Sequence, residues 1–387
     1  MQKLIPYGRQ TIDAQDIRAV VKVLKSDFLT QGPTIERFEK AVASYCGVKY
    51  AVAFSSGTAA LHGACFAAGI TQGDEVITTP MTFAASANCV FYCGGTPIFA
   101  DIRKDLPLID VGEIAKKITR HTKVLIPVDY SGIPADYDEI NVLARKYELI
   151  VIADSAHSLG ATYKGKKVGT LADMTMFSFH PVKVITTGEG GMIVTNNKLF
   201  YEKMLMFRTH GITKNRDYLK NKNPGSWYYE MQELGFNYRL TDIQAALGTS
   251  QLIKIEQFIR KRKHIADYYS RAFANLKQIS MVNVTSDRES AWHLFPIYLK
   301  LTQLKKRKIE IVKAFHQVHI RVQVHYIPVH IHPFYRKHLR SQVVKPNRAE
   351  DYYQGEISLP IYPKLAKKEA EYVVKQTYKI IRRFSDK

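Results

Sequence analysis

Short runs rich in β-branched residues alternate with helical segments over residues 50 to about 240. This alternation limits the possible folds more than any other feature of the chain. The runs include "KYAVAF", "DEVITTP", "TPIFADI", "TKVLIPVDY" and "LIVIAD", and the intervening segments, such as "YDEINVLARKYE", have the spacing of helices. Strands separated by helices pair in parallel, and helices cover both faces of the sheet. We therefore predict an α/β domain built on a largely parallel sheet.

The pattern changes near residue 240. The stretch "LTDIQAALGTSQLIKIEQFIRKRKHIADYYSRAFANL" has apolar residues three and four positions apart, which predicts a long helix with at most one break. Beyond it, expected strands ("LFPIYLKL", "RVQVHYIP") are mixed with helices. A chain of 387 residues is long enough for more than one core. We predict a large α/β domain over residues 1–245, and a linking helix with a smaller α+β domain over residues 246–387.

Composition excludes several other classes of protein. The chain is 46% hydrophobic and 24% charged, as globular proteins are. No apolar run reaches the roughly 18 residues of a membrane span, and residues 1–17 lack the apolar core of a signal peptide, so we expect a cytoplasmic protein without a membrane partner. Cys46, Cys65, Cys89 and Cys93 lack the paired spacing of a zinc or redox site. We expect no metal, and reduced thiols packed as small apolar side chains.

The net charge of +21, from 56 basic and 35 acidic side chains, suggests an anionic partner. The runs "RKRK" (260–263) and "KKRK" (305–308) could bind the phosphates of nucleic acid. Both runs lie in helix-like segments with apolar partners, which favours solvated outer faces, and no nucleic-acid-binding motif accompanies them. We expect no nucleic-acid partner. A basic surface would instead steer a small polyanion such as a nucleotide diphosphate toward the protein.

Three features of the first domain are compatible with one kind of ligand. The turn "SSGT" (Ser56, Gly57, Thr58) opens a helix, where it could hold a phosphate or act as an ordinary cap. Asp154 ends "LIVIAD", at the edge where parallel strands open into a ligand crevice, although it could also cap a turn. Lys183, between "MTMFSF" and "TTGEGG", is a surface charge or, if partly buried, an amine nucleophile.

A phosphate-bearing aldehyde with a pyridine ring would give each feature a role. The turn would hold the phosphate, Asp154 would pair with the pyridinium nitrogen, and Lys183 would form the imine. The order of phosphate turn, aspartate and lysine along the chain also fits a pyridoxal-phosphate fold. The sequence thus predicts pyridoxal 5'-phosphate as the cofactor.

Over nearly its full length the chain resembles the DegT/DnrJ/EryC1/StrS family of nucleotide-sugar aminotransferases, a branch of the fold-type I pyridoxal-phosphate enzymes. The motifs that carry the resemblance are "LTQGP" (29–33), "SSGTAALHGA" (55–64), "ITTPMTFAASAN" (77–88), "ADSAHSLGA" (153–161), "SFHPVKVITTGEGG" (178–191), "LGFNYRLTDIQAALG" (234–248) and "VHYIPVH" (324–330).

The resemblance implies a role for each matching residue. Lys183, Asp154 and His157 match catalytic positions, and His157 would contact the phenolic side of the cofactor ring. Phe83 matches the aromatic that stacks on that ring. The phosphate-side groups would be Ser56, Gly57, Thr58 and Ser178. Asn237 matches a residue supplied by a neighbouring subunit, which implies a homodimer with a shared site.

The resemblance also implies a sugar-nucleotide site and an amino donor. The matching stretches are Tyr7, Asp27, Phe28, Leu29 and Thr30, then Gln323, Val324, His325 and Tyr326, together with Gly57, Ser178 and Asn237. L-Glutamate is the implied donor. Arg239 is a candidate for holding its carboxylate, with a structural salt bridge as the alternative.

Within the family, "IPYGRQTID", "WYYEMQELGFNYRLTDIQ" and "VHYIPVHIHPFYR" are most similar to the transaminases of pseudaminic acid biosynthesis. Those enzymes aminate C4 of a UDP-linked 4-keto-6-deoxy-N-acetylhexosamine and form UDP-4-amino-4,6-dideoxy-N-acetyl-β-L-altrosamine. Perosamine-type GDP sugars and bacillosamine- or aminoarabinose-type UDP sugars stay open as substrates. Two rival interpretations are sugar 3-dehydration, whose enzymes have histidine in place of Lys183, and a catalytically silent binding or regulatory protein. The segment "IRKDLPLIDV" departs from the polar turn expected after "FADI".

Overall fold

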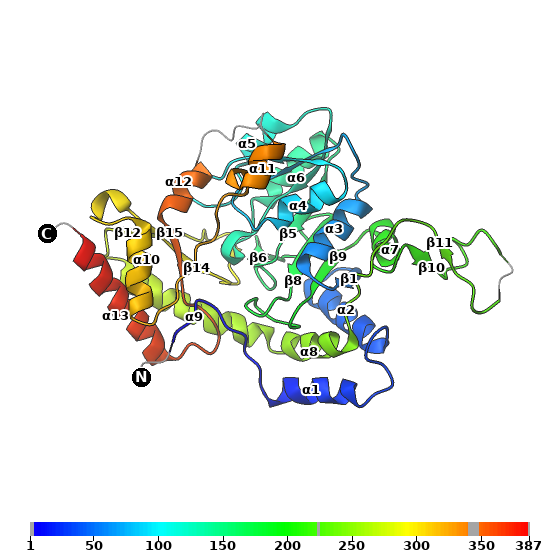
Figure 1. The fold of residues 1–387 in the computed structure, drawn as a ribbon, viewed down its shortest axis with the longest axis horizontal. Coiled ribbons are helices and arrows are strands. Elements are labelled where there is room, and N and C mark those ends of the chain that lie inside the picture. Colours follow the sequence, from blue (N-terminus) through cyan, green and yellow to red (C-terminus); the bar gives the residue numbers. More distant parts are fainter. Residues whose placement is uncertain (1–3, 223–224, 340–347, 386–387) are drawn as a thin grey trace.

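A seven-stranded sheet forms the centre of the molecule (Figure 1) in a computed structural model that describes residues 4–222, 225–339 and 348–385. The strand order is β1-β9-β8-β5-β4-β2-β3, and among the paired neighbours only β9 runs antiparallel to the strands beside it. The strands are β1 (Tyr50–Phe54), β2 (Glu75–Thr78), β3 (Thr96–Phe99), β4 (Thr122–Ile126), β5 (Ile150–Asp154), β8 (Met174–Ser178) and β9 (Gly191–Thr195). The predicted mostly parallel α/β sheet is confirmed.

Helices cover both faces of this sheet because successive strand residues point to opposite sides. In β5, Val151 and Ala153 belong to one apolar core, while Ile152 belongs to the core on the other face. The first core includes residues of α2 (Pro33–Cys46), α5 (Val111–Lys117), α6 (Tyr137–Lys146), α8 (Asp242–Leu252) and the start of α9 (Ile255–Phe273). The second includes residues of α3 (Gly57–Ala67), α4 (Ala85–Tyr92) and α7 (Lys198–Phe207).

The long helix predicted after residue 240 is two helices, α8 and α9, with the break at residues 253–254. Thr241 caps α8 together with Gln244 in a capping box. The N-terminal helix α1 (Ala14–Leu24) lies along α8 (Figure 1). The buried Asp16 of α1 fixes this contact by accepting hydrogen bonds from Ser250 and Gln251, both at 2.7 Å.

The C-terminal part of the chain has a core of its own, at the left of Figure 1. A three-stranded antiparallel sheet in the order β12-β14-β15 packs with helices, and Ile5 from the N-terminal segment joins this core. The domain boundary at residue 245 stays a prediction, and residues 1–3, 223–224, 340–347 and 386–387 of the two predicted domains lie outside the described residues. The elements here are β12 (Ile279–Met281), β14 (Phe295–Leu299), β15 (Glu356–Leu359), η2 (Leu301–Gln303), α10 (Lys308–Gln317), α11 (Pro333–His338), α12 (Arg348–Gly355) and α13 (Lys367–Phe384).

Two expectations are wrong in detail. "RVQVHYIP" forms no strand and makes only an isolated bridge at Gln323, because the His325 N–H donates to the Glu356 side chain instead of to a neighbouring strand. The "RKRK" run is not wholly solvated, since Arg262 is 1% exposed. Its guanidinium donates to the backbone carbonyls of three segments, which replace the water it gives up.

Short elements complete the described chain. A small sheet is formed by β6 (Thr162–Tyr163), β7 (Lys166–Lys167) and β13 (Arg288–Glu289), and the 3-10 turns are η1 (Tyr130–Gly132) and η3 (Val329–Ile331). The β10 (Ile212–Thr213) and β11 (Glu230–Met231) hairpin projects to the right in Figure 1. All four cysteines are free thiols, three of them buried. Among the described residues no helix is both long and apolar enough to span a bilayer.

Candidate active site

The sheet topology brings the three predicted features to one edge. β5 and β8 are parallel neighbours with Asp154 opposite Met176, so Asp154 and the loop that carries Lys183 leave the sheet side by side. β9 lies between β8 and β1 in the sheet. The backbone of Ser56 approaches Gly191 of β9 closely, since a Cβ atom on Gly191 would lie 2.4 Å from the Ser56 carbonyl oxygen. The start of α3 therefore lies against the same edge, as expected for a ligand crevice at the carboxyl ends of strands.

A cavity of about 520 Å³ opens at this edge. Thirteen of the predicted site residues line it: Tyr7, Ser56, Gly57, Thr58, Phe83, Asp154, His157, Ser178, Lys183, Gln323, Val324, His325 and Tyr326. Asp27, Phe28, Leu29, Thr30 and Asn237 do not line it, and all five are exposed. One chain thus assembles most of the predicted site but not all of it.

Asp154 is a buried carboxyl group inside a hydrogen-bond network. Its Oδ2 accepts a hydrogen bond from Ser86 Oγ at 2.5 Å, and its Oδ1 accepts one from the Ala156 N–H at 3.2 Å. Ser86 is also 2.6 Å from Thr82 Oγ1. Burial raises the pKa of Asp154, although the hydrogen bonds and Lys183 oppose this shift. A cation bound beside it, such as a protonated ring nitrogen, would stabilise the ionised carboxylate.

Lys183 is held at the cavity by the turn that precedes it, in which its N–H donates to the His180 carbonyl at 2.9 Å. Burial lowers the pKa of Lys183 to about 8, and the carboxylate of Asp154 opposes this shift. An ordinary lysine stays protonated until near pH 10. At physiological pH the amine of Lys183 is therefore neutral far more often than the amine of an ordinary lysine. A neutral amine is the nucleophilic form and the form that can accept a proton.

His157 also lines the cavity. Its Nε2 lies 3.0 Å from the Tyr326 hydroxyl, and its ring is 4.3 Å from the ring of His293. Its Nδ1 is buried and has no hydrogen-bond partner among the described residues. Burial, with Lys183 and His325 adding to it, lowers the pKa of His157 well below its usual value. The imidazole is therefore neutral, with one nitrogen left for a ligand.

The start of α3 forms a cradle of backbone and small side chains. Ser56 caps the helix by accepting a hydrogen bond from the Ala59 N–H at 3.1 Å. A Cβ atom on Gly57 would lie 3.2 Å from Ser178 Cβ and 3.3 Å from Met176 Sδ, so only glycine fits without crowding. Thr58 and Ser178 add hydroxyl groups to the same wall. The N-terminal end of a helix, with its free backbone N–H donors, can bind a phosphate group.

Phe83 is an open platform, 62% exposed, with its ring 6.3 Å from that of Tyr326. An exposed aromatic ring at a cavity can stack on a planar ligand. The structure also reveals lining residues that sequence reasoning missed, notably His293 and Glu189, and the Ser86 hydroxyl behind Asp154. Ser86 lies within the motif "MTFAASAN", so its signal was present, whereas His293 lies in no motif.

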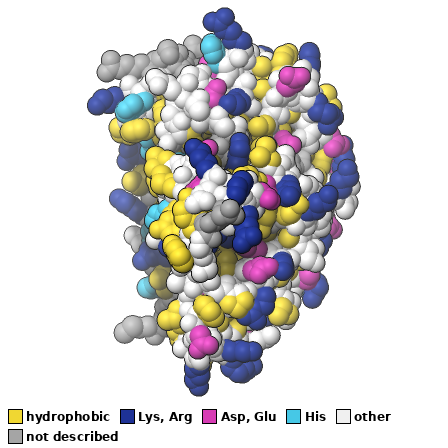
Figure 2. Space-filling view, turned by 90° about the vertical axis from the view of Figure 1, so that its right-hand side faces the viewer, with side chains coloured by type: hydrophobic (Ala, Val, Ile, Leu, Met, Phe, Trp, Pro, Cys, Tyr) yellow, Lys and Arg dark blue, Asp and Glu magenta, His cyan; other side chains and the backbone are white. Residues whose placement is uncertain are grey.

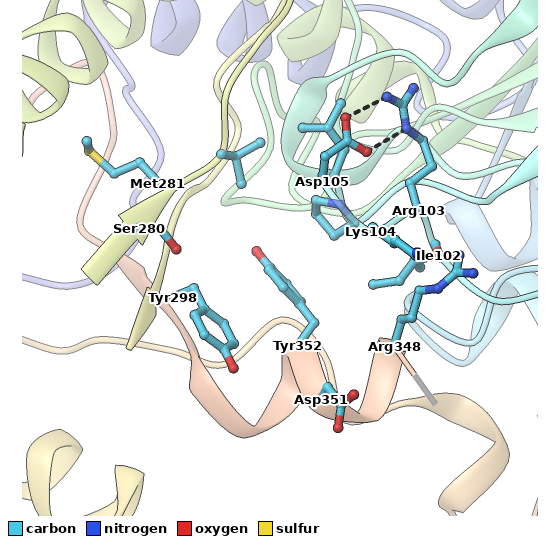
Figure 3. A pocket seen from close by; sticks show the side chains of 13 residues that line it. Ile102, Arg103, Lys104, Asp105, Ser280, Met281, Tyr298, Arg348, Asp351 and Tyr352 are labelled. Atoms are coloured by element: carbon cyan, nitrogen blue, oxygen red, sulfur yellow. Dashed lines mark hydrogen bonds and ion pairs between the residues drawn. The ribbon is translucent and has the colours of Figure 1, made fainter. Parts of the chain in front are cut away.

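A second cavity, of about 370 Å³, is separate from the first (Figure 3). One wall is formed by residues of "IRKDLPLIDV", the segment that differs from the polar turn expected after "FADI", and Arg103 is among them. Tyr298 and Tyr352 form another wall. The positive charge of Arg103 is paired with Asp105 and Asp136, and that of Arg348 with Asp110. This cavity contains none of the predicted site residues.

The residues of the first cavity fit pyridoxal phosphate. The buried Asp154 carboxyl suits a ring nitrogen, the unpartnered His157 Nδ1 suits a ring substituent, the Gly57 cradle suits a phosphate, and Lys183 suits an aldehyde. Fold and site together define the class of pyridoxal-phosphate-dependent transferases.

The chain belongs to the DegT/DnrJ/EryC1/StrS aminotransferase family, which it matches over residues 10–377. The cofactor of this aminotransferase is pyridoxal phosphate. The chain is 42% identical to the uncharacterized protein MJ1066 of Methanocaldococcus jannaschii over 98% of both chains. It is 38% identical to the UDP-4-amino-4,6-dideoxy-N-acetyl-beta-L-altrosamine transaminase of Campylobacter jejuni over 98% of both. It is 35% identical to the GDP-perosamine synthase of Escherichia coli O157:H7, over 96% of this chain and 97% of that one.

Solved structures agree with this assignment. Helicobacter pylori PseC, an aminotransferase involved in the biosynthesis of pseudoaminic acid, superposes with a TM-score of 0.92 at 35% identity, covering 99% of this chain and 100% of PseC. The PLP-form of Spr1654 from Streptococcus pneumoniae superposes with a TM-score of 0.90 at 30% identity, covering 98% and 99%. The predicted family, fold class and cofactor are confirmed.

Proposed function

We propose that this sugar aminotransferase moves the amino group of L-glutamate to C4 of a UDP-linked 4-keto-6-deoxy-N-acetylhexosamine. The product would be UDP-4-amino-4,6-dideoxy-N-acetyl-β-L-altrosamine, the amino sugar of pseudaminic acid synthesis, made in the cytoplasm. The observation that carries the proposal is the cavity in which Lys183, Asp154 and His157 meet the Gly57 cradle. The altrosamine transaminase at 38% identity and PseC at a TM-score of 0.92 support the choice of sugar.

Each residue would have a definite task in this reaction. Bound pyridoxal phosphate supplies an aldehyde that can carry an amino group and a ring that withdraws electrons from the carbon that loses its proton. Lys183 would hold the cofactor through Nζ, and its released amine would move the proton in both half-reactions. Asp154 would keep the ring nitrogen protonated, and His157 would orient the phenolic side. Ser56, Gly57, Thr58 and Ser178 would bind the phosphate, and Phe83 would stack on the ring.

We propose that the site is completed by a second copy of the chain. Asn237 does not line the cavity of its own chain, which supports its assignment to the partner's site. The hairpin region beside it exposes Trp227 (78%) and Leu234 (72%). Figure 2, which looks onto this side, shows hydrophobic side chains on the surface near the hairpin among dispersed basic and acidic ones. The exposed segment Asp27–Thr30 would contribute to the sugar-nucleotide site in the same dimer.

The assignment of the donor and the nucleotide is also a proposal. Arg239, which forms no ion pair with the described residues, stays a candidate for binding the glutamate carboxylate. Tyr7, Gln323, Val324, His325 and Tyr326 line the cavity and would face the sugar nucleotide. The net charge of +21 would steer a nucleotide diphosphate toward the protein.

A second candidate keeps the same chemistry with another nucleotide sugar. The 35% identity to a GDP-perosamine synthase favours a perosamine-type GDP sugar as that candidate. Sugar 3-dehydration is disfavoured by the lysine at position 183. A silent binding protein is disfavoured by the assembled cavity.

A glutamate-dependent assay tests the proposal. Purified protein loaded with pyridoxal phosphate is given UDP- and GDP-linked 4-keto-6-deoxy sugars, and the products are identified by mass spectrometry. We expect amination of the UDP-linked L-arabino 4-keto-N-acetylhexosamine. Amination of a GDP-linked sugar alone would overturn the substrate but keep the mechanism, and a lack of any aminated product would overturn the proposal.

A further inference from the structure

A buried carboxyl group lies behind the cavity without touching it. Glu356, the first residue of β15, is fully buried. Its Oε2 accepts a hydrogen bond from the His325 N–H at 2.7 Å, and its Oε1 is 2.7 Å from Ser358 Oγ. Ser358 Oγ is in turn 2.9 Å from Nδ1 of the His325 ring. A continuous chain of hydrogen bonds therefore runs from Glu356 through Ser358 to His325.

His325 is the end of this chain that reaches the cavity. It lines the cavity of Lys183, with its ring 5.4 Å from that of Tyr7. Its Nε2 has no hydrogen-bond partner among the described residues. Burial, with Lys183 adding to it, lowers the pKa of His325 to about 3, so the ring is neutral at physiological pH. A neutral imidazole has a single N–H, and its position decides whether Nε2 donates or accepts.

The chain of hydrogen bonds can run in two directions. Oε2 of Glu356 always accepts from the His325 N–H, so any proton on the carboxyl group sits on Oε1. A protonated Oε1 donates to Ser358, which donates to Nδ1 of His325 and leaves the imidazole proton on Nε2. An ionised carboxylate accepts from Ser358 instead, so Ser358 must accept from Nδ1 and Nε2 becomes an acceptor.

We propose that Glu356 is a positioning residue that sets, through Ser358, which nitrogen of His325 carries the proton and hence whether Nε2 offers the cavity a donor or an acceptor. A donor at Nε2 suits phosphate or carboxylate oxygens, and an acceptor suits a sugar hydroxyl. This consequence rests on the proposed function. The proton position itself does not depend on any substrate.

The surroundings of Glu356 set the pH at which the proton of His325 changes position. Burial raises the pKa of Glu356 to about 8, against the hydrogen bonds from Ser358 and His325 and against Lys308 of α10. The other titratable groups that face it are Tyr130 of η1, Tyr352 of α12 and Tyr326, all with raised pKa values. Tyr298, opposite Glu356 in β14, stacks on Tyr352 at 6.0 Å and helps to exclude water (Figure 3).

Nuclear magnetic resonance of the full-length protein loaded with pyridoxal phosphate tests the proposal. Histidine ring carbons are labelled with carbon-13 in a deuterated background, and their shifts report which nitrogen is protonated. The signal of His325, one of 13 histidines, is assigned by its loss in His325→Gln. Between pH 6 and 10 we expect it to change from the Nε2–H to the Nδ1–H form, with a midpoint near pH 8.

Two variants and a control sharpen the test. In Glu356→Gln the amide oxygen accepts from the His325 N–H, so its NH₂ group donates to Ser358 and should fix the Nε2–H form at every pH. Ser358→Ala should also abolish the transition near pH 8. Glu350→Gln, which alters a carboxylate 2.9 Å from another histidine, His330, should leave the His325 transition unchanged.

An invariant His325 signal in the unmodified protein, or the same transition in Glu356→Gln, would overturn the proposal. A transition that depends on Glu356 in a protein that aminates no sugar would support it while refuting the proposed function. The two failures are therefore distinguishable.

Discussion

Burial changes the chemistry of individual side chains in this protein. Lys183, His157 and Asp154 are ordinary residues by type, but burial in the cavity shifts the pKa of each in the direction that disfavours its charged form. Desolvation is the first cause in all three, because a low-dielectric site disfavours whichever form is charged. The same residues therefore respond strongly to a bound group that restores or removes a charge.

Replacing Lys183 with alanine should lower amination by about 10³-fold or more, since it removes the covalent anchor and the proton carrier together. Mass spectrometry of the aminated sugar measures the loss, and borohydride reduction should no longer attach the cofactor to the protein. Lys198→Ala, on the exposed side of α7, is the matched control and should retain full activity. Turnover by Lys183→Ala close to that of the control would rule out the assigned mechanism.

Replacing Asp154 with asparagine should lower kcat/KM by about 100-fold, the equivalent of about 3 kcal/mol for the loss of one buried charge partner. Ser86→Ala, which keeps the Asp154 carboxyl group but removes its 2.5 Å hydrogen bond to Ser86 together with the contact between Ser86 and Thr82, should lower it about tenfold. Steady-state kinetics across a glutamate series gives both values. Equal losses in the two variants would argue that Asp154 acts through packing and not through its charge.

Glu356 should make the protein less stable as pH rises from 5 to 8. Its pKa is raised from 4.5 to about 8, so the folded state binds a proton that the unfolded state releases, and this stabilisation disappears as pH passes through 8. Urea unfolding should show the free energy of unfolding of the unmodified protein falling relative to that of Glu356→Gln as pH rises from 5 to 8, because the histidines with lowered pKa contribute equally to both proteins. The window stops at pH 8 because the pKa of Lys308, lowered to about 8, produces an opposite trend above it. Parallel curves for the two proteins would contradict the assignment.

At the scale of elements, one side chain of α9 holds together three other segments, one of which is the turn that carries Lys183. Arg262 Nη1 donates to the carbonyls of Trp292, His293 and Ile361 at 3.2, 3.2 and 2.9 Å, and Nη2 donates to that of Val182 at 3.5 Å. Val182 immediately precedes Lys183. Helix α9 thus fixes the turn that precedes Lys183. The hydrogen bonds go to backbone carbonyl groups, which any residue type at these positions would provide.

Arg262→Met should reduce the free energy of unfolding by about 3 kcal/mol, because it leaves buried carbonyl groups without donors. Arg260→Met, on the exposed face of the same helix, should change it by less than about 0.5 kcal/mol. Urea denaturation followed by fluorescence measures both. If the two variants unfold at the same urea concentration, the buried guanidinium does not hold these segments together.

At the scale of the whole molecule, the cavity of one chain lacks five of the predicted site residues. Asn237 and the segment Asp27–Thr30 are exposed and absent from the cavity wall, and the projecting hairpin region exposes Trp227 and Leu234. Contiguous patches of exposed apolar side chains mark interaction surfaces. A homodimer would bury them and supply the missing residues in a single step.

The double variant Trp227→Glu, Leu234→Glu should convert dimer to monomer and lower amination by about 100-fold, since a charge desolvated in an apolar interface is costly. Sedimentation velocity measures the mass, and kinetics measures the activity. Ile253→Glu, at the equally exposed break between α8 and α9, is the control and should leave both unchanged. A fully active monomer would refute the shared site.

The sequence by itself determined the alternation of strands and helices along the chain, the mostly parallel class of sheet and the cofactor chemistry. These follow from local periodicity and from short motifs such as "SSGT" and "HPVK", whose residues act close to where they stand in the chain. Tertiary structure alone decided that Arg262 is buried, that "RVQVHYIP" is not a strand, and that His293 and Glu356 stand beside and behind the cavity. Each of these features depends on contacts between segments far apart in the sequence. Such contacts decide which side chains are buried, and burial in turn shifts their pKa values. Residue type alone therefore does not determine these pKa values.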